Sequence, residues 1–335
     1  MQHRLSANAQ GLMATQYDRK AEDLGNVVML EHVNLQIPDQ VMATSFYVSG
    51  LGLTRDPYLN TGIRNIWINV GKSQFHLPTG DPWLLRGTIG LVTPDRAALL
   101  DRLAGVRKEL DGSKFGFTER DDHIEATCPW GNRFRLHSPD EGRFGAAKLG
   151  MPYVEFDTPA GTADGIARFY REILGALTRV EANGEGRVAH IAVGHKQELL
   201  FRETEGELPP YDGHHIQVYV QDFSGPHDEL AKRELITEES NPYQYRFEDI
   251  VDVETDETLF EIEHEIRSLT HPLYARPLVN RNPAQSQRNY RMGGDEWEWE
   301  LPRSNAPLPG VAPVVSAKAA ALAERRARRM GQRRM

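Results

Sequence analysis

Cysteine is almost absent from this 335-residue chain, whose single cysteine is Cys128. An intrachain disulfide and a metal site made of several cysteine thiolates are therefore both excluded. Such sparse use of cysteine fits a reducing compartment, and we expect the protein to be cytoplasmic.

Long apolar stretches and an excess of positive charge are also missing. No run approaches the ~18 consecutive apolar residues that a membrane helix requires. The polar first 26 residues lack the apolar segment of a signal peptide. The formal net charge of −9 argues against a protein whose main task is to grip a nucleic-acid backbone. We therefore expect no membrane span and no nucleic-acid partner.

A degenerate pattern recurs four times along the chain, each copy reading as a strand, a helix and three further strands. The copies begin at residues 32–39, 88–95, 153–159 and 215–222, where apolar and polar residues alternate with the period of a strand. Helices are predicted at 41–48, 96–108 and 163–174 in the first three copies. The closing strands are predicted at 73–77, 133–137 and 259–263 in copies one, two and four.

These units cannot be stable alone, because each leaves one face of a small curved sheet uncovered, so copies must pair. The predicted fold class is α+β. In chain order we expect an N-terminal extension at 1–26, copies one and two at 27–145, and copies three and four at 146–270. An extended C-terminal segment with a basic tail is expected at 271–335.

The motifs of the first copy resemble those of the vicinal oxygen chelate superfamily, which includes glyoxalases, bleomycin-resistance proteins and extradiol dioxygenases. They are His-Val-x-Leu-x-Ile-Pro-Asp at 32–39, then Phe-Tyr and Gly-Leu-Gly-Leu, then Gly-x-x-Gln-Phe-His-Leu at 71–77. The resemblance covers residues 27–270. It implies that four βαβββ modules pair into two cup-shaped half-barrel sheets with helices outside.

Strand periodicity selects the side chains that face away from the core. His32 and His76 lie on the polar faces of the first and last strands of copy one. His215 and Glu261 lie at the corresponding positions of copy four. Copies two and three offer only Thr88, Arg135, Tyr153 and Leu199 there, and so lack a ligand set.

The resemblance implies a metal held between paired modules by first-strand and last-strand residues. Only pairing of copy one with copy four gathers three histidines and a carboxylate, so we expect that pairing, with copies two and three forming a second cup without a metal. The predicted ligands are His32, His215 and Glu261. Glu263 and Glu265 share the face of Glu261 and compete with it, and His214 competes with His215.

Two histidines and a carboxylate are typical of non-haem Fe(II) oxygenases. The resemblance then implies that His76 is the acid–base residue of a ring-cleaving dioxygenase acting on a small aromatic diol of catechol or hydroquinone type. Such enzymes tend to carry a tyrosine on the strand before the glutamate. In the simplest register this chain departs from that pattern and has Val251 there, with Tyr243 and the candidate Tyr245 several residues earlier. Alternatives are a Ni- or Zn-dependent isomerase or lyase with His76 as fourth ligand, Mn in place of iron, and a non-enzymatic small-ligand-binding protein. The sequence is also compatible with assembly into a homo-oligomer.

Overall fold

The computed structural model describes residues 18–58, 64–183, 186–277, 286 and 290, and its elements follow the predicted order in all four modules. Module one contains β1 (Val27–Asn34), α1 (Gln40–Ala43), the π-helix η2 (Thr44–Gly50), β2 (Thr54–Arg55), β3 (Asn65–Val70) and β4 (Ser73–Pro78). Module two contains β5 (Gly87–Val92), α2 (Arg96–Gly105), β6 (Gly116–Glu119), β7 (His123–Thr127) and β8 (Arg133–His137). Module three contains β9 (Gly150–Pro159), α4 (Ala163–Glu172), β10 (Thr178–Asn183), β11 (Gly186–Gly194) and β12 (Gln197–Thr204). Module four contains β13 (His215–Val220), α5 (Ser224–Lys232), β14 (Ile236–Asn241), β15 (Gln244–Val251) and β16 (Thr258–Ser268). The short helices η1 (Lys20–Glu22) and α3 (Glu141–Phe144) lie outside the modules.

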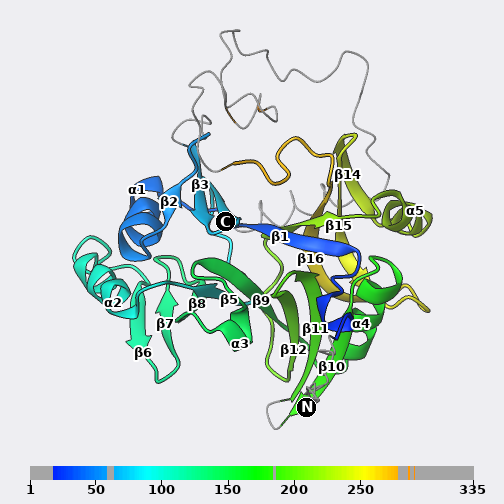
Figure 1. Cartoon of the computed structure of the whole chain (residues 1–335), viewed down its shortest axis with the longest axis horizontal. Helices are drawn as coiled ribbons and strands as arrows, with labels where there is room; N and C mark the ends of the chain where they lie inside the picture. The colour runs from blue at the N-terminus through cyan, green and yellow to red at the C-terminus, as the bar shows by residue number, and fades with distance from the viewer. Residues whose placement is uncertain (1–17, 59–63, 184–185, 278–285, 287–289, 291–335) are drawn as a thin grey trace, which may run out of the picture.

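The strands form two open eight-stranded sheets (Figure 1). Their orders are β14-β15-β16-β13-β1-β4-β3-β2 and β10-β11-β12-β9-β5-β8-β7-β6. The antiparallel pair β1–β13 joins modules one and four, and the antiparallel pair β9–β5 joins modules three and two. The predicted α+β fold, with module one paired to four and two to three, is confirmed.

Aspartates begin the helices of the first two modules. The Asp39 carboxylate accepts hydrogen bonds from the backbone N–H groups of Val41 and Met42, and Asp95 caps α2 in the same way. The helix predicted at 41–48 therefore begins where expected, but it continues as the π-helix η2. It ends at Gly50, where a Cβ atom would approach Val106 Cγ2 to 3.2 Å.

One apolar core lies between the two sheets. Phe75 of β4 contacts Phe134 of β8, and Phe156 of β9 contacts Phe260 of β16, each with ring centroids 5.9 Å apart. Because side chains alternate along a strand, the polar side chains of each sheet point to the face away from this core. Each sheet thus presents its own polar cup.

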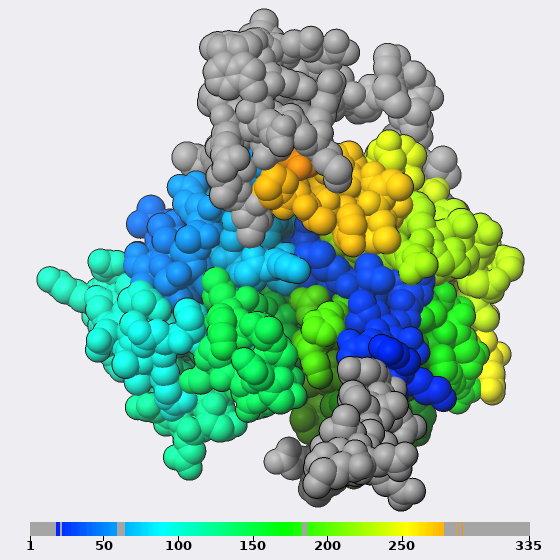
Figure 2. All heavy atoms as spheres, viewed as in Figure 1, coloured from blue at the N-terminus to red at the C-terminus, as the bar shows by residue number. Residues whose placement is uncertain are grey.

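The chain beyond β16 turns back across the first sheet (Figure 2, orange). Residues 269–275 form turns rather than the extended segment we expected from their prolines. Tyr274 contacts Tyr219, and Arg276 forms a buried ion pair with Asp56. The predicted basic tail lies outside the described residues. In the described part of the chain, no helix is long and apolar enough to cross a membrane.

Candidate metal centre

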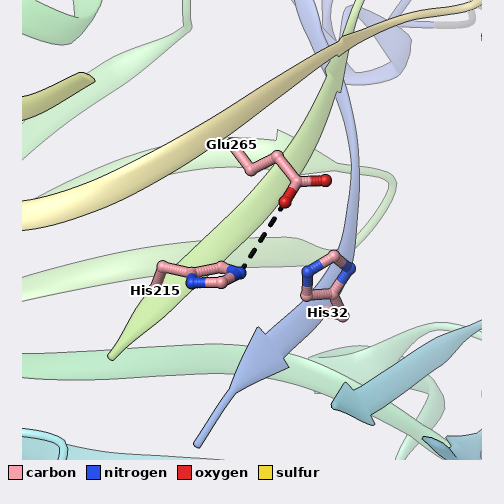
Figure 3. A group of neighbouring side chains, drawn as sticks. All are labelled: His32, His215 and Glu265. Atoms are coloured by element: carbon pink, nitrogen blue, oxygen red, sulfur yellow. Dashed lines mark ion pairs between the residues drawn. The ribbon is translucent and has the colours of Figure 1, made fainter. Parts of the chain in front are cut away.

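Two histidines and one carboxylate converge on the polar face of the first sheet (Figure 3). One ligand-type atom from each of His32, His215 and Glu265 lies within 4.8 Å of the others, and all three side chains are buried. They come from the adjacent strands β1, β13 and β16. His32 lies opposite Gln217, which in turn lies opposite Glu265, so the register of three strands brings the groups together.

The structure places Glu265, and not the predicted Glu261, beside the two histidines. Glu261 lies opposite Asp249 on β15, and its backbone carbonyl accepts a hydrogen bond from Arg86. The two glutamates are four positions apart, roughly 13 Å along β16. The prediction ended the last strand near Glu263, whereas β16 continues to Ser268 and carries the same polar face further.

His32 is oriented by the residue that precedes it. Its Nδ1 lies 3.0 Å from Glu31 Oε2, and a carboxylate can only accept, so Nδ1 carries the proton. The other ring nitrogen, Nε2, is buried and has no hydrogen-bond partner. An orphaned imidazole lone pair that points toward a carboxylate is what a metal ion would satisfy.

His215 repeats this arrangement. Its Nδ1 lies 3.3 Å from Glu263 Oε1, while its Nε2 lies 3.7 Å from Glu265 Oε2. The predicted competitor Glu263 is therefore placed behind the histidine. Both histidines have a carboxylate on the far side of the ring, the outer contact that fixes the tautomer of metal-bound imidazoles.

Two arginines hold the three carboxylates of this site. Arg246 donates to Glu263 Oε1 at 2.6 Å and also to Glu265. Arg267 donates to Glu31 Oε2 at 3.0 Å and forms an ion pair with Glu265 Oε1 at 2.5 Å. Glu265 thus lies between two guanidinium groups, which keep its buried charge compensated.

These surroundings set the charges of the site. Burial lowers the pKa of His32 despite the opposing effect of its hydrogen bond to Glu31, and burial with the nearby Arg246 lowers the pKa of His215 well below its usual value. Burial alone would raise the pKa of Glu265, but Arg267 and Arg246 outweigh it and lower that pKa. Near neutral pH the site therefore offers two neutral imidazoles and an ionised carboxylate, the donor set of a divalent transition metal.

His76 lies beside this group without belonging to it. Its ring stacks on His32 at 3.7 Å and on Trp67 at 3.8 Å between centroids. The Gln74 amide donates to Asp56 Oδ2 and Asn69 Oδ1, which leaves Gln74 Oε1 to accept from His76 Nε2 at 3.1 Å. Nδ1 of His76 therefore keeps its lone pair. Burial lowers the pKa of His76 well below its usual value.

Tyr245 is not brought to the site. Its ring packs against Phe223 and His227 of the α5 region, and its hydroxyl donates to the Phe223 carbonyl at 3.4 Å. It lies on the core face of β15, because its neighbour Arg246 takes the cup face. Tyr219 of β13 does lie in the cup, and its hydroxyl donates to Glu31 at 3.4 Å.

His214, the competitor of His215, points away from the cup. Its Nδ1 is bonded to Asp212 at 2.7 Å, and its ring contacts Tyr211.

Sequence reasoning missed Glu31, Arg246 and Arg267 entirely. Arg267 shares its strand phase with the glutamates of β16, and Arg246 alternates with the core residues Tyr245 and Phe247 of β15; these phases were the available signal. Glu31 had no such signal, since it precedes His32 by one residue and should face the core.

The second cup holds ion pairs where the first holds the histidines. The Glu155 carboxylate lies between Arg135 at 3.3 Å and Arg202 at 3.1 Å. Within the described ranges, the group on the first sheet is the one cluster of three metal-ligating side chains whose ligand atoms lie within 4.8 Å of one another.

Comparison with known proteins supports the fold. No family model and no curated protein matches the sequence. Among solved structures, a "putative dioxygenase" from Bacillus subtilis has a TM-score of 0.52 at 14% identity, covering 83% of this chain and 92% of that one. Glyoxalase I from Zea mays has a TM-score of 0.52 at 13% identity, covering 72% of this chain and 92% of that one. The chain therefore shares the fold of these two solved structures.

Proposed function

We propose that the protein is a metal-dependent enzyme of the vicinal oxygen chelate superfamily. It would open the ring of a small aromatic diol with molecular oxygen. His32, His215 and Glu265 would hold Fe(II), with Mn, Ni and Zn as the competing metals. The observation that carries the proposal is the orphaned Nε2 of His32, which faces a neutral imidazole and an ionised carboxylate at ligand spacing. Three ligands on one side of a metal leave positions open for the two diol oxygens and for oxygen.

Other residues of the site would orient the metal ligands and transfer a proton. Glu31 and Glu263 hold the ligand imidazoles in one tautomer, and Arg267 and Arg246 donate hydrogen bonds to those carboxylates. His76 Nδ1 has a free lone pair next to the ligand set and would take the proton of a diol hydroxyl and later return it. The His76 ring is fixed between His32 and Trp67, so the base does not need to be ordered when substrate binds.

Oxygen uptake by Fe(II)-loaded protein tests the proposal. Catechols and hydroquinones should be consumed with oxygen, and His76→Gln should lower kcat by roughly 10²–10⁴-fold while metal content stays unchanged. His137→Gln, on the second sheet, is the control and should leave kcat unaltered. No oxygen consumption on any diol of either class would contradict the dioxygenase proposal.

A second candidate is an oxygen-independent isomerase or lyase that uses Ni or Zn. The contact between His76 and His32 favours it, because a ring stacked at 3.7 Å is close enough to become a fourth ligand after a side-chain rotation. In that case His76→Gln would lose metal as well as turnover. Tight ligand binding that is unaffected by chelators, without turnover, would instead indicate a non-enzymatic binding protein.

A further inference from the structure

The strand that carries His32 is irregular at that residue. Leu30 lies opposite Val218 and His32 lies opposite Gln217, so Glu31 is an extra residue on β1. Such a bulge turns two consecutive side chains to the same side of a sheet. Glu31 reaches Arg267 and Tyr219 in the cup, and its neighbour His32 reaches the ligand cluster. Without the bulge, one of the two would point into the core.

A glutamine from the other sheet bonds the backbone of this bulge. Gln197 Oε1 accepts from the backbone N–H of Leu30, and Gln197 Nε2 lies 3.1 Å from the Leu30 carbonyl oxygen. The same amide nitrogen lies 3.1 Å from both Ser73 Oγ and the Met151 carbonyl oxygen. One side chain therefore ties β1 to β4 and to the start of β9 at the residue before Glu31.

The turn that presents Gln197 is pressed against β1. Gly194 adopts φ +153°, and a Cβ atom there would lie 3.1 Å from the Val28 carbonyl oxygen and 2.5 Å from Gln197 Oε1. A side chain at this position would thus displace both the strand and the glutamine. The β11–β12 turn of the second sheet is shaped to insert one amide into the first sheet.

We propose that Gln197 is a positioning residue of the metal centre: its amide fixes the bulge that aims Glu31 and His32 into the cup. The second sheet, in whose described residues no ligand set is found, would thereby contribute to the site of the first. This inference rests on the metal site of the proposed function. It concerns a residue on a different sheet from all three ligands.

Co(II) titration of the full chain, read from its visible absorption, tests the role of Gln197. Gln197→Met keeps the length of the side chain and removes the amide. We expect Co(II) affinity to fall by about tenfold, as when an outer contact of a ligand is lost, with an altered absorption band. The matched control is Gln40→Met, since Gln40 Nε2 also bridges a carbonyl and a hydroxyl, of Leu77 and Thr79. That variant should bind Co(II) as the unaltered chain does.

Gln197→Glu provides a second variant if Gln197→Met does not fold. It still accepts from Leu30 N–H but cannot donate to the carbonyls, so its Co(II) affinity should also fall. Thermal unfolding of the metal-free variants separates positioning from general stability. Unchanged affinity and absorption in the folded Gln197 variants would overturn this inference and leave the proposed function intact. Failure of the unaltered chain to bind Co(II) would overturn both.

Discussion

At the residue scale, Glu31 is the position where a small change tests the site most selectively. Its carboxylate accepts from His32 Nδ1 and from Arg267, and it does not belong to the ligand group. Glu31→Gln keeps the size of the side chain and removes the charge that favours the required tautomer of His32. We expect metal affinity to fall about 10–100-fold.

The measurement is a competition titration with a chromophoric chelator. Glu125→Gln, at an exposed ion pair on the second sheet, is the control and should bind metal normally. Equal affinity of Glu31→Gln and the unaltered chain would show that the Glu31–His32 contact does not support metal binding.

Part of the site could be predicted from single residues and part could not. His32 and His215 were found because strand alternation places them opposite a buried apolar face. Glu31 could not be predicted, because a β-bulge interrupts the alternation of side chains at this residue. Nothing in the local sequence marks that bulge. Tyr245 was chosen from a family resemblance, although its own strand phase, shared with Phe247, points to the core.

At the element scale, the strands β10, β11 and β12 are tied by one charged cluster. Arg179 Nη1 contacts Glu198 Oε1 at 2.5 Å, and His190 Nδ1 lies 3.3 Å from Glu198 Oε2. Burial would raise the pKa of Glu198, but its hydrogen bonds with His190 and Arg179 outweigh burial and lower the pKa from 4.5 to about 2.

Because the pKa of Glu198 is lower in the folded chain than in the unfolded chain, the free energy of unfolding depends on pH. The contribution of Glu198 to the free energy of unfolding is fully present above pH 4.5, its usual pKa, and is lost as the pH falls toward about 2. Glu198→Gln should therefore flatten the pH dependence of stability in that window. Urea unfolding at several pH values measures this, and parallel curves for both proteins would contradict it.

The register between strands decides which glutamate of β16 lies beside the histidines. Both Glu261 and Glu265 fit the periodicity of β16, so periodicity alone could not choose between them. The choice depends on how β16 is aligned with β13, where His215 lies opposite Glu263. That alignment is set by contacts between strands of different elements, which the sequence of one strand does not contain.

At the scale of the whole molecule, the two sheets share one core and should unfold together. Phe134 of the second sheet contacts Phe46, Tyr47 and Phe75 of module one. Phe134→Ala should lower the free energy of unfolding by about 3–5 kcal/mol, in a single transition. Leu177→Ala, at a side chain that is 45% exposed, should change it little. Two separate transitions in denaturant would contradict a shared core.

The pairing of the modules was predictable from the positions of the expected metal ligands. Only one pairing of the four copies collects histidines and a carboxylate, and the strand order shows that pairing. The contact of the β11–β12 turn with the bulge of β1 was not predictable, because it depends on how the two sheets are placed against each other.

The most direct test of the account is the iron content of three proteins after anaerobic reconstitution with Fe(II): the unaltered chain, Glu265→Gln and Glu261→Gln. The two glutamates share a strand and a face, and Glu265 is the one that lies beside the histidines. We predict about one iron per chain in the unaltered protein and in Glu261→Gln, and almost none in Glu265→Gln. Iron retained by Glu265→Gln, or lost from Glu261→Gln alone, would contradict the proposed metal centre.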